Sequence, residues 1–160
     1  MLNKATIREG MGFGVTSAIL TTLGLFLGLL SSTSSKLAVI GGIVTIALAD
    51  ALSDSFGMHI SLEYGRSENK HNVWSATIAT FIYKFVFAGV FIIPVLLWSL
   101  TTAAVVSIIY GLLVIIYISY LTARQNNDVV WRVIISHVLI TMVVILLSFS
   151  VGKLVAHYFA

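Results

Sequence analysis

The stretch KLAVIGGIVTIALADALSDSFGMHIS, residues 36–61, decides the class of fold. It is long enough to cross a bilayer, because about 20 helical residues span the hydrocarbon core. Asp50 and Asp54 nevertheless interrupt this apolar stretch. A carboxylate near the bilayer centre costs at least about 2.5–3.5 kcal/mol to insert, so such residues are functional candidates by default. The stretch therefore predicts a transmembrane helix that carries a site.

The rest of the chain has the composition of an integral membrane protein. Of its 160 residues, 59% are hydrophobic and 9% are charged, whereas a soluble domain carries about 25% charged residues. The absence of cysteine excludes disulfides and thiolate chemistry. There is no HExxH motif and no serine convincingly paired with a base, so we predict that the protein is not an enzyme. The net charge of +3 is small and no nucleic-acid-binding motif is present, so no nucleic-acid partner is expected.

Five apolar segments predict an all-α fold with five transmembrane helices in a single domain, residues 1–160. The expected spans are about 11–31, 37–62, 73–98, 101–123 and 132–156. The first apolar run is too long for a typical signal peptide and no small-residue cleavage site follows it. Pro94 and the WSLTT that follows shortly after it predict the break between the third and fourth spans.

Basic residues predict how this bundle is oriented. Two fall on the side that holds the C-terminus, Lys36 and Lys153. Six fall on the side that holds the N-terminus: Lys4, Arg8, Arg66, Lys70, Arg124 and Arg132. Because positive charge is retained in the cytoplasm, we expect a cytoplasmic N-terminus and an outer or luminal C-terminus. The expected location is the cell (inner) membrane, with a vacuole-type membrane as the alternative.

Small residues follow one face of the first span. Steps of three and four residues place on that face Gly10, Gly14, Ser17, Thr21, Gly24 and Gly28. Small residues let membrane helices approach closely, and hydroxyls hydrogen-bond across the contact. We predict a glycine seam for helix packing, within the chain or between two copies. A further interpretation is that Ser17 and Thr21 line a polar path.

The second span has a matching face that includes Asp50 and Asp54, with Met58 one turn beyond. Two ionised carboxylates one turn apart repel each other. A bound divalent cation or an added proton would relieve both this repulsion and the cost of burial. The alternative is a structural role, in which the pair is neutralised by Lys84, mid-way along the third span, or capped by hydroxyl groups.

Other side chains extend the candidate path. Carboxylate, imidazole and thioether together suit Fe²⁺ better than Ca²⁺ or Mg²⁺, and carboxylates also suit Mn²⁺. Glu63 is expected at the cytoplasmic mouth, where it attracts cations or is simply solvated. His59 does not share the face of Asp54 well and is interpreted as an interfacial residue first and a ligand second. His137 could relay protons or bind metal, and the alternative is a histidine that is hydrogen-bonded to a neighbouring helix.

Two segments, TSAILTTLGLFLGL (16–29) and GGIVTIALADALSDSFGMHIS (41–61), resemble the vacuolar iron transporter family, also called nodulin-like. Its members carry NDGIVSTxxxxxG in the first helix and AGALSMAAGEYVS in the second. The shared core is TT…G in the first span and ALS…G…IS in the second. The resemblance implies a homodimer with the ion path near its axis. It also implies export of Fe²⁺, and often Mn²⁺, from the cytosol in exchange for protons.

The sequence departs from the family pattern at the metal-binding positions. The family aspartate of the first span aligns with Ser17, and the family glycine, methionine and glutamate of the second align with Asp50, Asp54 and Met58. The loop EYGRSENKHN (63–72) is too short for the metal-collecting domain of many members. The carboxylates have largely moved from the first span to the second, which implies a short branch with another ion or another coupling.

These observations predict a transporter of a divalent transition metal, iron or manganese, with no permanently bound cofactor. Asp50 and Asp54 would be membrane ligands or proton carriers. Secondary contacts are expected from Ser17, Thr21 and Met58. One alternative is a proton or cation channel that uses the same aspartates. Another is a non-transporting membrane assembly partner in which the aspartates are held by Lys84.

Overall fold

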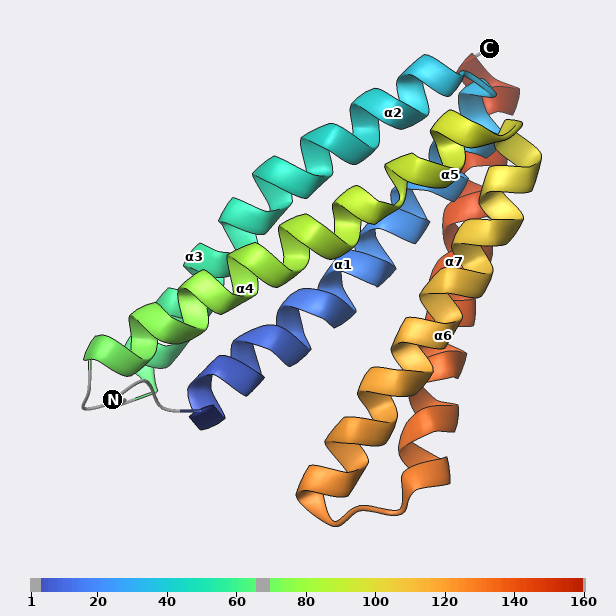
Figure 1. The fold of residues 1–160 in the computed structure, drawn as a ribbon. Helices are drawn as coiled ribbons and strands as arrows, with labels where there is room; N and C mark the ends of the chain where they lie inside the picture. The colour runs from blue at the N-terminus through green and yellow to red at the C-terminus, as the bar shows by residue number, and fades with distance from the viewer. Residues whose placement is uncertain (1–3, 66–69, 160) are drawn as a thin grey trace.

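A computed structural model describes residues 4–65 and 70–159, which form helices and no strand (Figure 1). The elements are α1 (Lys4–Thr33), α2 (Lys36–Thr45), the π-helical turn η1 (Ile46–Asp50), α3 (Ala51–Tyr64), α4 (Lys70–Val90), α5 (Ile92–Leu97), α6 (Leu100–Asn126) and α7 (Val130–Phe159). Because α2, η1 and α3 follow without a break, they make one long helix.

Five helical segments are long and apolar enough to cross a membrane, so the five predicted spans are confirmed. They are Ala5–Thr33, Lys36–Tyr64, Asn72–Leu97, Leu100–Asn126 and Val130–Phe159. Each begins before its predicted start, above all the first, and all but the third also end later than predicted. The chain is thus a multi-pass, all-helical membrane protein by length and composition.

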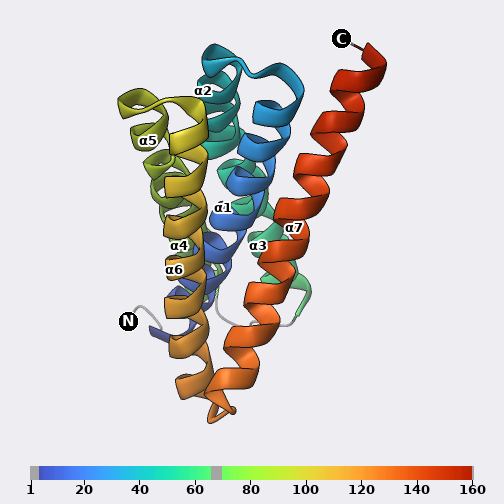
Figure 2. The ribbon, with the colours of Figure 1, turned by 90° about the vertical axis from the view of Figure 1, so that its right-hand side faces the viewer.

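The start of α1 and the end of α7 lie at opposite ends of the bundle (Figures 1 and 2). The start of α1 shares its end with the α6–α7 turn, while the α1–α2 and α5–α6 turns lie near the C-terminus. An odd number of membrane crossings requires that the first and last helices begin and end on opposite sides. Of the basic residues that predict the orientation, Arg66 lies outside the described residues.

Polar residues end the helices where the sequence indicates. Ser34 has a left-handed backbone, with φ of 50°, just after α1 ends. Ser35 then caps α2, because its side chain accepts a hydrogen bond from the Ala38 backbone N–H. Asn127, with φ of 56°, ends α6 in the left-handed conformation that asparagine tolerates.

The structure shows two separate interruptions of the helix where the sequence predicts one break around Pro94. Pro94 lies within α5 and has no N–H to donate to the Val90 carbonyl, so α4 ends at Val90 and the third span is interrupted there. The break between spans three and four falls later, at Trp98 and Ser99. Ser99 caps α6 by accepting from the Thr102 backbone N–H at 3.4 Å.

The glycine seam packs α1 against its neighbours within the same chain. In its first half, Gly10 and Gly14 lie against the α4 backbone. A Cβ on Gly14 would lie 2.7 Å from the Thr80 carbonyl oxygen, a contact that a backbone cannot relieve. In its second half, Gly24 faces Ser148 of α7, where a Cβ would lie 3.0 Å from the hydroxyl oxygen. The seam therefore makes α1 the central helix.

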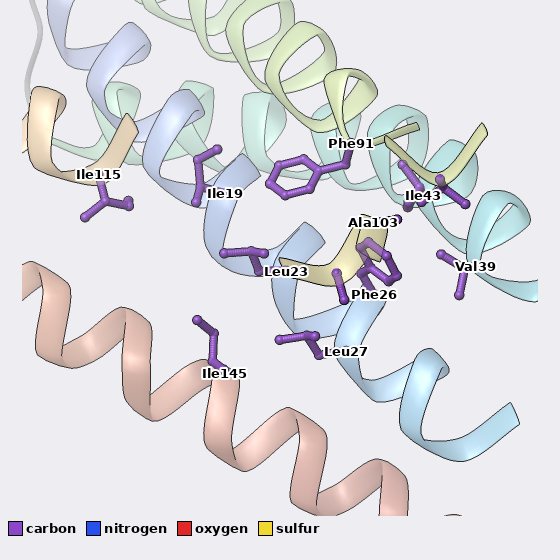
Figure 3. Packing of buried hydrophobic residues seen from close by; sticks show 12 residues of the cluster. Ile19, Leu23, Phe26, Leu27, Val39, Ile43, Phe91, Ala103, Ile115 and Ile145 are labelled. Atoms are coloured by element: carbon purple, nitrogen blue, oxygen red, sulfur yellow. The ribbon is translucent and has the colours of Figure 1, made fainter. Parts of the chain in front are cut away.

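An apolar core surrounds the middle and second half of α1 (Figure 3). Its fully buried side chains include Ile19, Leu23, Phe26, Val39, Ile43 and Phe91. The outward faces of the spans expose many large apolar side chains, and α7 is the least buried span. Such faces suit contact with lipid, which is as apolar as leucine.

Candidate functional site

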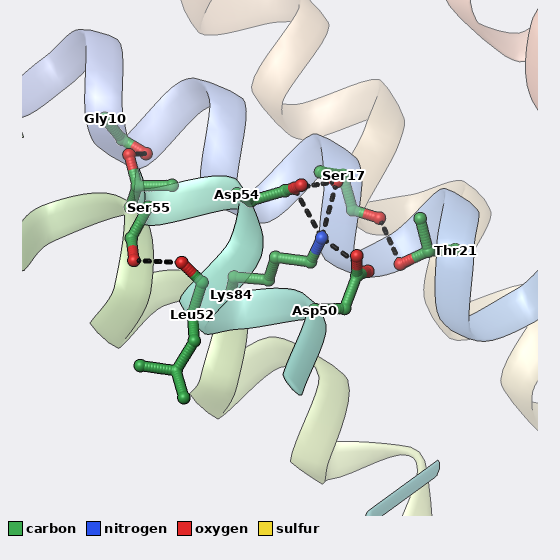
Figure 4. Close-up of polar contacts among 9 residues, drawn as sticks. Gly10, Ser17, Thr21, Asp50, Leu52, Asp54, Ser55 and Lys84 are labelled. Carbon is green, nitrogen blue, oxygen red and sulfur yellow. Dashed lines mark hydrogen bonds and ion pairs between the residues drawn. The ribbon is translucent and has the colours of Figure 1, made fainter. Parts of the chain in front are cut away.

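Charged side chains from neighbouring helices meet in one cluster (Figure 4). Asp50 lies 14 residues from either end of the span 36–64, which is about 21 Å at 1.5 Å per residue. Lys84 lies 12 and 13 residues from the ends of the span 72–97. The charged cluster, defined as Asp50, Asp54, Lys84 and the hydroxyl of Ser17, thus lies far from both helix ends.

Lys84 is the shared partner in this cluster. Its Nζ atom lies 2.5 Å from Asp50 Oδ2, pairs with Asp54 Oδ2, and donates to Ser17 Oγ at 2.9 Å. Its side chain is 1% exposed, against 28% for Asp50 and 21% for Asp54. The sequence left open which aspartate pairs with Lys84, and the ammonium in fact contacts both.

The two aspartates are held differently. Asp54 Oδ2 accepts hydrogen bonds from Lys84 Nζ and from Ser17 Oγ, the latter at 2.6 Å. Asp50 Oδ2 is buried, and the Lys84 ammonium at 2.5 Å is the one polar partner that the described residues give it. Asp50 is therefore the carboxylate with more capacity for a further partner.

The charges in the cluster do not balance when all groups are ionised. Two carboxylates face one ammonium, and the described residues place no other charged group within 4.0 Å of Lys84. The cluster then carries a net charge of −1. Because an unpaired charge is costly at this depth, one additional proton or cation would stabilise the cluster.

Local sequence explains how three helices converge here. Gly14 lets α4 approach α1, because a Cβ there would lie 3.3 Å from the backbone nitrogen of Lys84. Ser17 lies one turn further along the same face and reaches the ammonium. The π-helical turn η1 ends at Asp50, and such turns are frequent at functional sites. No glycine or proline in IALAD signals this turn in the sequence.

Three of the predicted path residues lie outside the cluster. Thr21 donates to the Ser17 carbonyl oxygen at 2.8 Å, so its hydroxyl is satisfied within α1 beside the cluster. Met58 and Glu63 lie further along α3, and among the described residues the ion pairs of Lys84 are with Asp50 and Asp54. The structure brings together only the central part of the predicted path.

His137 lies on α7, away from the charged cluster. Its Nδ1 atom is 2.8 Å from Ser119 Oγ on α6, as the interhelical alternative predicts. It also lines a cavity of about 670 Å³ between the start of α1 and the α6–α7 hairpin, together with Arg8 and Glu9. Within the described part of the chain, its side-chain hydrogen bond is to Ser119, and the ion pairs of the aspartates are with Lys84.

Sequence reasoning missed two neighbours of His59. Thr77 and Trp74, both on α4, contact the imidazole. In the sequence, the one feature that links Trp74 to Thr77 is that they lie about one turn apart on a predicted helix. Ordinary helix packing produces the same spacing, so it does not indicate contact with His59. Within residues 4–65 and 70–159, no group of three or more His, Asp or Glu side chains is arranged to hold a metal.

Comparisons with known proteins assign no family to this chain. No protein-family model matches the chain, and no curated protein or solved structure matches it significantly. The resemblance to the vacuolar iron transporter family therefore stays a prediction from the two quoted segments.

Proposed function

We propose that this chain transports a divalent transition metal, iron or manganese, out of the cytosol in exchange for protons. The observation that carries the proposal is a pair of mid-span carboxylates that share one buried ammonium. Lys84 and a metal compete for the same oxygen atoms. The surplus negative charge draws a cation to Asp50, and the ammonium returns to the carboxylates when the cation leaves.

The proposal includes a homodimer. An open groove lies between α1 and the second span, and Asp50 is among the residues that line it. Its other lining residues are mostly apolar or small: Leu25, Leu29, Ala38, Gly42, Thr45, Ile46, Ala49 and Ser53. A second copy seated there would cover the exposed part of the Asp50 side chain and keep it away from lipid. Light scattering in detergent should then give a protein mass near twice the 17.3 kDa of one chain.

The proposed orientation follows the basic residues, with the N-terminus in the cytoplasm. In that orientation α3 ends at the cytoplasmic side, and the groove beside Asp50 extends toward the outer or luminal side. We propose the cell membrane as its location.

Ion flux into liposomes tests this function. Purified protein would be reconstituted around a metal-quenched dye, and Fe²⁺, Mn²⁺, Zn²⁺ and Ca²⁺ would be offered in turn, with and without a pH gradient. We expect uptake of Fe²⁺ or Mn²⁺ that the pH gradient accelerates and that protein-free liposomes lack. Proton or monovalent leak without metal uptake would instead identify a channel.

A second candidate function is favoured by the contacts of Lys84. An ammonium that already contacts both aspartates fits a non-transporting assembly partner, in which the ion pairs hold α1, α3 and α4 together. In that case the liposomes show neither metal uptake nor proton leak. Lys84 would then matter for stability alone.

A further inference from the structure

A second pair of metal-ligating side chains lies near the end of α3, separate from the charged cluster. His59 and Glu63 are one turn apart, and His59 Nε2 lies 4.0 Å from Glu63 Oε2. The histidine side chain is 15% exposed and the glutamate side chain is 53% exposed. The imidazole is therefore held in the bundle while the carboxylate reaches its surface.

The hydrogen bonds of Thr77 fix which ring nitrogen of a neutral His59 is free. The Thr77 hydroxyl donates its single proton to the Val73 carbonyl oxygen at 2.8 Å. His59 Nδ1 lies 3.1 Å from the same hydroxyl oxygen, so Nδ1 must carry the proton and donate it. The lone pair of the neutral ring then lies on Nε2, the atom that faces Glu63.

The ring is also held in place by packing. Trp74 of α4 meets His59 edge to face, with ring centroids 4.7 Å apart and an interplanar angle of 64°. A hydrogen bond on the opposite nitrogen and a fixed ring orientation are the usual supports of a metal-binding histidine. One helix, α4, supplies both supports.

We propose that His59 Nε2 and the Glu63 carboxylate form a two-ligand loading site for a divalent transition metal. Imidazole and carboxylate suit Fe²⁺ and its neighbours in the first transition row. Two metal–ligand bonds of about 2.1 Å hold their ligand atoms about 3.0–3.4 Å apart at octahedral or tetrahedral angles. The Glu63 side chain, which is 53% exposed, can close the 4.0 Å gap to that distance by rotating, without a movement of α3.

The surroundings of the pair also favour a cation. The C-terminal end of a helix carries partial negative charge, and the last turn of α3 contains no basic residue. His59 and Glu63 lie more than one turn beyond Asp54 along the same helix, between the charged cluster and the end of α3. Delivery of metal from this site to the charged cluster rests on the proposed transport function. Metal binding by His59 and Glu63 is independent of that function.

The fluorescence of Trp74 tests this site directly, because the indole touches the proposed ligand. The chain has three tryptophans, and a Trp98→Phe/Trp131→Phe variant keeps only Trp74. Co²⁺ would be titrated into this full-length protein in detergent as the probe, since a paramagnetic ion quenches an adjacent indole. We expect saturable quenching, which His59→Gln abolishes.

Further variants separate binding from general structural effects. Thr77→Val removes the group that fixes the ring and should weaken Co²⁺ binding about tenfold or more. His157→Gln, an exposed histidine at the opposite end of the bundle, should leave quenching unchanged. Far-UV circular dichroism would verify that each variant remains helical.

Asp50→Asn/Asp54→Asn should also keep the quenching, because the two sites are separate. Unchanged quenching in His59→Gln would overturn the proposal, as would loss of quenching in the aspartate double variant. Absent metal flux with intact, His59-dependent quenching would refute the transport function while leaving the loading site standing.

Discussion

Replacing Lys84 with methionine is the most informative perturbation of the charged cluster. Methionine keeps the length and packing of the side chain but removes the ammonium that both aspartates contact. Two carboxylates one turn apart would then face each other at mid-span with no positive partner. The net charge of the ionised cluster would change from −1 to −2.

The expected loss follows from burial. Removing one member of a buried ion pair costs about 3–5 kcal/mol, because the other charge is left without a partner. The aspartate side chains are about a quarter exposed, which allows partial relief, so we expect a loss of about 3 kcal/mol, the lower end of that range. Lys84→Met/Asp50→Asn/Asp54→Asn leaves no stranded charge and should regain most of the loss.

Unfolding in mixed micelles with increasing SDS, followed by far-UV circular dichroism, would measure these differences. The wild type, Lys84→Met, Asp50→Asn/Asp54→Asn and the triple variant form a cycle that isolates the interaction energy between Lys84 and the aspartates. If Lys84→Met unfolds at the same SDS fraction as the wild type, the ammonium does not neutralise the aspartates, and the geometry of the cluster is misread.

Three further outcomes follow from the same contacts. Gly14→Ala should destabilise the protein by about 1–3 kcal/mol in the same SDS titration, because the added Cβ meets a carbonyl group of α4. Gly57→Ala is the control and should leave the stability unchanged, because its added Cβ has no neighbouring atom within 4 Å. Asp54→Asn should cost more stability than Asp50→Asn, because Asp54 accepts two hydrogen bonds; equal losses would contradict this asymmetry. Lys84→Met should bind Mn²⁺ more tightly than the wild type in an electron paramagnetic resonance titration, because the competing ammonium is gone.

Much of the fold could be predicted from the sequence because a bilayer leaves few alternatives. A spanning segment must satisfy its own backbone hydrogen bonds, so each long apolar run indicates a helix. The three- and four-residue spacing from Gly10 to Gly28 likewise predicted close helix packing. The structure adds that α4 and α7, within the same chain, occupy that face.

The details of the site could not be predicted, because they depend on contacts between distant segments. Ser17 and Lys84 are 67 positions apart, and only the approach of α4 at Gly14 brings them together. The π-helical turn before Asp50 has no residue signature in IALAD. The tautomer of His59 depends on Thr77, whose own partner is visible only in the structure.

The most direct measurement of the central claim is Mn²⁺ uptake by proteoliposomes that contain Asp50→Asn, Asp54→Asn or the double variant. Asp128→Asn, an exposed carboxylate between α6 and α7, provides the matched control. The account predicts uptake at the wild-type rate in the control and none in the double variant. Uptake at the wild-type rate in the double variant would contradict the claim that these two aspartates carry the metal.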